Sequence, residues 1–119
     1  MNQTDAFRVL ASADRQLILH ELLDSDGSMS VSILAERVAS RRHRIPTGTI
    51  SDDKVDRAQV RLVHQHFPRL ISHDIIAVDW TEERVSLVDT EDVDCLLTAA
   101  AELERWPPDG LLEQPEPSS

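Results

Sequence analysis

The chain has 119 residues and a formal net charge of −10, and its single cysteine is Cys95. This length predicts one domain with a modest core. A lone cysteine excludes an intramolecular disulfide and a cysteine-rich metal site. Because no apolar run is long enough to span a bilayer, a cytoplasmic protein is expected.

The charge is unevenly distributed along the sequence. Residues 37–69 carry eight Lys or Arg and three Asp, hence +5, whereas the rest carries four basic and nineteen acidic residues, hence −15. A large acidic excess, few aromatic residues and a single lysine, Lys54, together indicate a protein adapted to molar salt, although an ordinary acidic protein has the same composition. The sequence thus predicts one basic segment in an acidic chain.

Periodic apolar residues predict short helices in the first half of the chain. A serine at a helix start accepts a hydrogen bond from a free backbone N–H of the first turn. The expected elements are one or two turns within residues 1–10, a helix over 13–23 after Ser12, a brief extended piece over 28–30, and a helix from 31 to about 40 after Ser30. Residues 41–53 contain Pro46 and Gly48, which predict an irregular connector.

The longest amphipathic segment covers residues 54–72, with Ser51 as its expected N-cap. Pro68 lacks a backbone N–H, so a kink or a separate last turn is expected near residues 64–68. One side of this central helix is apolar. The other side carries Lys54, Arg57, Arg61, His64 and Gln65.

The remaining elements are a β-hairpin and a last helix. β-Branched residues at 75–79 and 84–88 predict the hairpin. The helix is expected from residue 91 to about 105, after Thr90, and residues 107–119 are predicted to be disordered. The expected fold is mainly α-helical with a small hairpin, a winged helix-turn-helix. A single domain over residues 1–106 would hold the three-helix core, the wing and the C-terminal helix. Its predicted core includes Leu19, Leu22, Leu34, Val38, Leu62, Phe67, Leu70, Ile76 and Val85.

Two stretches resemble a large group of haloarchaeal winged-helix domains, related in fold to ArsR-like regulators and mostly of unassigned function. These are Leu10-Ala11-Ser12 with Arg15 before a leucine-rich helix, and His66-Phe67-Pro68-Arg69-Leu70 before the apolar residues 75–79. The resemblance covers residues 6–88 and implies a winged helix.

The chain departs from that group at two places. Gln59 stands where an aromatic residue is common, and His73-Asp74 stands where Ala-Gly is common before the hairpin. A left-handed residue at the second place must therefore be His73 or Asp74.

The basic side of the central helix is the candidate functional surface. Arg and Lys bind phosphates, and Arg, Gln and His can read base edges in the major groove. The predicted DNA-binding residues are Arg41, Arg42, Arg44, Lys54, Arg57, Arg61, His64 and Gln65. The alternative is an arginine-rich face that only meets solvent.

No metal, cofactor or catalytic site is predicted. His64 and His66 are two residues apart on a helix and therefore point in different directions. We expect His66 to be buried and bonded to backbone. Ser, His and Asp residues are scattered, without a nucleophile turn or a glycine-rich phosphate loop, so no enzyme is expected.

The apolar face of the last helix is wide for a terminal helix. It comprises Val93, Leu96, Leu97 and Ala100. Because winged-helix regulators commonly dimerise through terminal helices, we predict a two-fold interface here, with Trp106 near its edge. Packing onto the chain's own core is the alternative.

These patterns predict a DNA-binding transcriptional regulator of a halophilic archaeon, acting as a homodimer. The alternative is a winged-helix module for protein–protein contact without a nucleic-acid role. Surface charge distinguishes them. A continuous positive strip along Arg57, Arg61 and residues 41–44 favours DNA, whereas neutralisation by nearby acids favours protein contact.

Overall fold

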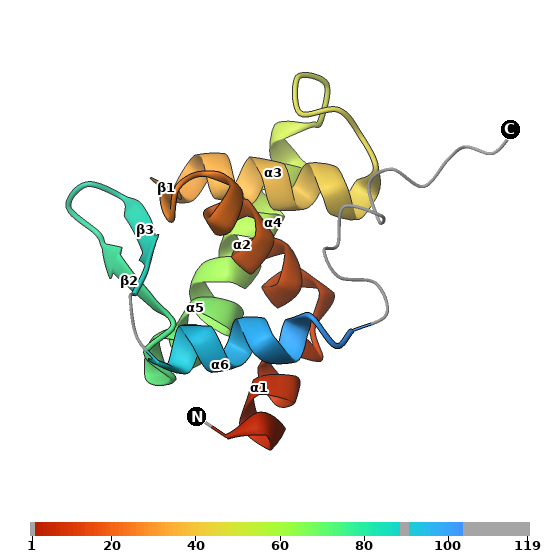
Figure 1. Cartoon of the computed structure of the whole chain (residues 1–119). Helices are drawn as coiled ribbons and strands as arrows, with labels where there is room; N and C mark the ends of the chain where they lie inside the picture. The colour runs from red at the N-terminus through yellow and green to blue at the C-terminus, as the bar shows by residue number, and fades with distance from the viewer. Residues whose placement is uncertain (1, 89–90, 104–119) are drawn as a thin grey trace, which may run out of the picture.

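The computed structural model describes residues 2–88 and 91–103. It is mainly helical, with a small three-stranded antiparallel sheet (Figure 1). The elements in chain order are α1 (Gln3–Leu10), α2 (Ala13–Asp24), β1 (Ser28–Ser30), α3 (Val31–His43), α4 (Asp52–Arg61), a π-helical turn (Leu62–His66), α5 (Phe67–Ser72), β2 (Ile76–Asp79), β3 (Arg84–Leu87) and α6 (Glu91–Ala100).

Serine side chains start α2, α3 and α4, as predicted. The Oγ atoms of Ser12, Ser30 and Ser51 accept hydrogen bonds from the backbone N–H three residues later, at 3.4, 3.1 and 3.3 Å. Each bond satisfies one donor that the first helical turn leaves free.

Helix α3 is longer than expected. It continues to His43 and ends where Arg44 adopts a left-handed conformation with φ 57°. Basic residues in its last turn suit the negative end of the helix dipole, which favours this extension. Arg41 and Arg42 are therefore helical, and the connector to α4 is shorter than predicted.

The central helix is interrupted where Pro68 predicts it. The N–H of Phe67 bonds to the carbonyl of Leu62, five residues earlier, which makes residues 62–66 a π-helical turn. Pro68 then lies in the first turn of α5, where its missing N–H leaves no helical bond unmade. The turn joins the largely exposed α4 to α5, which buries Phe67 and Leu70.

The predicted hairpin is present, and a third strand joins it. β2 and β3 pair antiparallel with Val78 opposite Val85, and β1 pairs with the other side of β3, where Met29 is opposite Val85. The strand order is β1-β3-β2. The extended piece expected at residues 28–30 is therefore an edge strand of the sheet.

Two turns use residues other than glycine. At the hairpin tip, the Asp79 carboxylate accepts hydrogen bonds from the N–H groups of Thr81 and Glu82, at 3.0 and 3.2 Å, and Glu83 has φ 53°. Before β2, Asp74 has φ 59°. Asp tolerates the left-handed conformation better than most residues, and Asp74 is one of the two residues expected to adopt it.

The nine residues predicted for the core are all buried. They belong to one apolar cluster that joins α2, α3, the π-helical turn, α5 and the sheet. A smaller cluster of Ala39, Ile50 and Ala58 holds α4 against α3. The prediction of one shared core for the helices and the hairpin is confirmed.

Helix α6 lies beside α1 and completes this core (Figure 1). Leu96 and Ala100 are fully buried, in the same cluster as Val9 and Leu10 of α1. Within the described residues the helix ends at Ala100, earlier than expected. The predictions for Thr90, Trp106 and residues 107–119 lie outside the described residues.

Candidate functional site

A buried carboxylate, Asp14 on α2, collects basic side chains from three other segments. Its oxygens lie 2.7 Å from Nη1 of Arg42 on α3 and 3.6 Å from Nε of Arg61 on α4. Nε2 of His66, in the π-helical turn, is 3.4 Å away. The expectation that Arg61 shares the outward face of Arg57 is wrong, because the Arg61 guanidinium turns inward to this acid and is only 33 % exposed.

His66 is buried, as predicted, but its partners are side chains rather than backbone. Its Nδ1 lies 3.3 Å from Nη1 of Arg15. A guanidinium can only donate, so Nδ1 accepts and the ring proton lies on Nε2, facing Asp14. Arg15 also donates to the carbonyls of Arg8 and Val9, at 3.0 and 2.6 Å. These contacts join α1, α2 and the π-helical turn.

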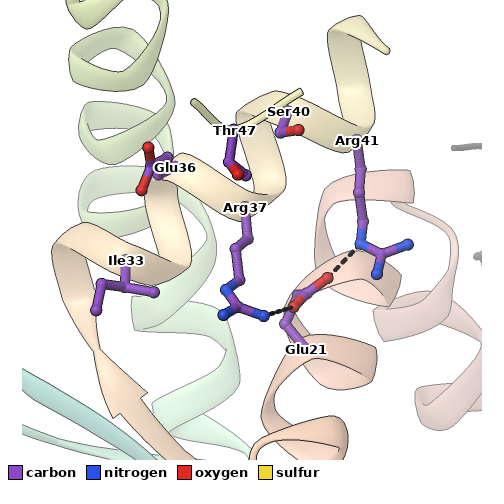
Figure 2. Close-up of a pocket in the computed structure, with 7 residues that line it drawn as sticks. All are labelled: Glu21, Ile33, Glu36, Arg37, Ser40, Arg41 and Thr47. Carbon is purple, nitrogen blue, oxygen red and sulfur yellow. Dashed lines mark hydrogen bonds and ion pairs between the residues drawn. The ribbon is translucent and has the colours of Figure 1, made fainter. Parts of the chain in front are cut away.

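A second buried acid, Glu21, lies two turns further along α2 (Figure 2). Its carboxylate contacts Nε of Arg41 and lies 3.6 Å from Nη1 of Arg37, both on α3. The Glu21 side chain is 1 % exposed and that of Arg41 is 14 % exposed. Arg41 therefore presents little of its charge to a macromolecular ligand. The pocket beside this cluster has a volume of about 410 Å³ and is lined by Glu21, Ile33, Glu36, Arg37, Ser40, Arg41 and Thr47.

Neither buried acid is predicted as a site residue from the sequence patterns above. The spacing of the two acids in the sequence nevertheless indicates that they are buried. Asp14 and Glu21 are seven residues apart, so they share a helix face with Leu17 and Ile18, which are buried. A carboxylate on a buried face needs a basic partner, and α3 is rich in arginine.

The surroundings of Asp14 change its acidity. Burial alone would raise the pKa of Asp14, but hydrogen bonds from His66 and Arg42, with the positive charge of Arg42, lower that pKa from 3.8 to about 2. A lowered pKa in the folded state means that the ionised carboxylate stabilises the fold at any pH above its unfolded value. This contribution is lost as the pH falls toward 2.

We therefore expect an acid-dependent stability that Asp14→Asn removes. The folded and unfolded pKa values imply that Asp14 contributes about 2 kcal/mol more to the free energy of unfolding at about pH 6 than at about pH 2. Urea titrations of both proteins across this range measure the difference. Parallel curves for the wild-type protein and Asp14→Asn would contradict the role given to Asp14.

The other predicted DNA-binding residues lie outside these buried clusters. Arg57 is 72 % exposed and pairs at 2.9 Å with the equally exposed Asp53, one turn earlier on α4. Such a surface pair contributes only about 0.3–0.5 kcal/mol. Arg44, His64 and Gln65 are exposed and Lys54 is half-buried. Arg41, Arg42, Arg57 and Arg61 thus all pair with acids.

Within the described residues, the most exposed large apolar side chains lie on α4 and the hairpin. Val60 is 58 % exposed and Trp80, which follows β2, is 54 % exposed. The Trp80 ring lies 6.5 Å from the ring of the core residue Phe67, measured between centroids, which anchors it beside α4. With wing used only as a short name for the β2–β3 hairpin, the hollow between α4 and this hairpin is called the α4–wing groove. Its volume is about 350 Å³, and it is lined by Asp56, Gln59, Val60, Val63, His64 and Trp80.

The predicted dimer interface is largely occupied by the chain's own core. Leu96 and Ala100 have no exposed surface, Val93 is buried, and Leu97 is half-buried against the core. This is the packing expected under the alternative, in which α6 completes the core. In this arrangement the buried side chains of the face are not available to a second copy, and dimerisation itself stays a prediction.

Within residues 2–88 and 91–103, no three His, Cys, Asp or Glu side chains gather closely enough to hold a metal ion. His64 points outward and His66 inward, as their spacing predicts. In this same part of the chain, every helix is too short or too polar to cross a membrane.

The comparisons with known proteins give one match. A family described as a domain of unknown function, DUF7344, matches residues 7–86, which begin in α1 and end within β3. No curated protein and no solved structure matches the chain. The matched segment contains both buried acids, the π-helical turn and the α4–wing groove, and covers more than half of the sequence. The chain belongs to the DUF7344 family.

Proposed function

We propose that the chain is a winged-helix domain. The support is the element order α2, β1, α3, α4, β2, β3 together with the strand order β1-β3-β2. In such a domain α4 is the helix available to a ligand and the β2–β3 hairpin is the wing. The sequence resemblance to haloarchaeal winged-helix domains supports the same assignment.

We further propose that this domain is a protein-contact module whose docking surface is the α4–wing groove. One contrast on α4 carries the proposal. The charges of its arginines are paired with acids, whereas an apolar side chain of the same helix is exposed to solvent. Arg57 and Arg61 pair with acids, whereas Val60 is exposed beside Trp80. Exposed apolar side chains bordered by polar ones are typical of protein-binding surfaces, and Trp is favoured at their centres.

A second candidate is a DNA-binding transcriptional regulator, acting as a homodimer. It is favoured by Arg57, His64 and Gln65, which are exposed on the helix that winged-helix proteins place in the major groove. Three acids in the first half of α4 oppose it, because Asp52, Asp53 and Asp56 would approach the phosphate backbone.

Parallel selections from random duplex DNA and from a displayed random-peptide library test these alternatives. We expect the protein to enrich peptides at low and molar salt and to enrich no duplex. Val60→Asp should abolish binding of the enriched peptides, because it puts a charge on the apolar surface. Ile71→Asp, a change of another exposed apolar residue, is the matched control. Enrichment of duplexes whose binding is lost with Arg57→Ala would instead establish the DNA function.

A further inference from the structure

The α4–wing groove has a floor that follows one helix. Its lining residues on α4 and in the π-helical turn are Asp56, Gln59, Val60, Val63 and His64. Asp56, Gln59 and Val60 are spaced i, i+3 and i+4 on α4, and Val63 and His64 of the π-helical turn line the same groove, so the five form one continuous stripe. A stripe of this shape suits a second helix lying along α4.

The polar side chains of the groove have no protein partner within the part of the chain that the structure describes. Asp56, Gln59 and His64 make no side-chain hydrogen bond or ion pair there. Arg57, next to Asp56 in sequence, pairs instead with Asp53. Asp56, the one carboxylate among the described residues that line the groove, is therefore open to a basic group brought by a partner.

The hairpin tip beside the groove is also acidic. Trp80 leads into the hairpin tip, which carries Glu82 and Glu83. Arg84 follows them, and its guanidinium is turned to Ser28 on β1, at 3.0 Å. Among the described residues no Lys or Arg lines the groove itself, and the bordering Arg57 and Arg61 pair with Asp53 and Asp14. Asp56 and the two glutamates of the hairpin tip favour a partner with a positively charged flank.

We propose that the occupant of the α4–wing groove is a basic amphipathic helix of another protein. Its apolar side chains lie on Val60, Val63 and Trp80, and a Lys or Arg on its flank pairs with Asp56. This inference rests on the proposed protein-contact function and adds the chemistry of the partner. It corresponds to the mode in which an amphipathic helix enters an apolar groove.

Two synthetic helical peptides with the same leucine face test the inference, one with lysine and the other with glutamate on the polar face. Fluorescence anisotropy at low and molar salt gives their dissociation constants. We expect the lysine peptide to bind about tenfold more tightly than the glutamate peptide at low salt. Asp56→Lys should remove most of this preference. A lysine peptide with scrambled order, and hence no apolar face, is the control for attraction by net charge alone.

Position-specific loss of binding identifies the groove. Val60→Asp and Trp80→Ala should each weaken the lysine peptide about tenfold or more, whereas Ile71→Asp should leave it unchanged. Circular dichroism confirms that each variant is folded. If Val60→Asp leaves binding intact, the peptide is held by net charge and the inference is overturned. If the glutamate peptide binds at Val60 as tightly as the lysine peptide, the partner chemistry is wrong and the protein-contact function stands. If neither peptide binds at Val60, both proposals fail.

Discussion

Asp14→Asn is expected to lower the free energy of unfolding by about 3 kcal/mol at neutral pH, because it removes a buried carboxylate and leaves the buried His66 and the partly exposed Arg42 and Arg61 without their partner. Arg42, Arg61 and His66 all lie within 3.6 Å of Asp14. The substitution keeps the shape of the side chain, so the packing around it changes little. Equilibrium unfolding in urea measures the loss. This is a large fraction of the about 5–15 kcal/mol that stabilises an ordinary domain.

Asp24→Asn is the matched control for that experiment. Asp24 is the last residue of the same helix and is exposed, so its substitution should change the free energy of unfolding by less than about 0.5 kcal/mol. Arg42→Gln should be milder than Asp14→Asn, because the Arg42 side chain is about half exposed and water can replace part of its pairing. A loss below about 1 kcal/mol for Asp14→Asn would show that the cluster does not hold these helices together.

The second large effect is expected for Leu96→Ala, which should destabilise the chain by about 2–5 kcal/mol through the cavity it leaves. Leu96 is fully buried in the cluster that joins α6 to α1, with Val9 and Leu10 on the facing helix. Thr98→Ala, on the exposed side of α6, is the control and should change the stability little.

This experiment also decides between the two roles of α6. Urea unfolding reports the packing of α6 on α1, and light scattering in molar salt reports the mass of the native protein. Packing within one chain predicts a large loss of stability with an unchanged mass. A dimer interface predicts that Leu96→Ala lowers the mass while the unfolding of the monomer hardly changes. The second result would support the two-fold interface predicted from the sequence, which comprises Val93, Leu96, Leu97 and Ala100.

Features that depend on neighbouring residues could be predicted from the sequence. The caps at Ser12, Ser30 and Ser51 need only a hydroxyl and a free N–H three residues away. Pro68 disturbs its own helix, and the β-branched residues of the hairpin alternate locally. The core could be predicted for a similar reason, because helical spacing alone places its apolar residues on one face.

The surface chemistry could not be predicted in this way, because it depends on which helices meet. Spacing puts Arg57 and Arg61 on one side of α4, yet Asp14 on a distant part of the chain turns Arg61 inward. The exposed apolar surface of α4 and the hairpin could not be predicted for the same reason. Val60 lies outside the apolar side predicted for the central helix. Trp80 lies in a turn between two strands, and only the folded hairpin brings it beside α4.

The π-helical turn gives this helical region one residue more than α-helical geometry would hold. Each residue of an α-helix advances by about 100° around the axis, so the surplus residue rotates everything after it by about that angle. His66 and Phe67 therefore both face the interior, with different neighbours, the first beside Asp14 and the second beside Trp80. A deletion of one residue within 62–66 would remove this surplus and turn α5 away from both Asp14 and Trp80. A constant number of residues from Ser51 to Asp74 is thus expected among relatives.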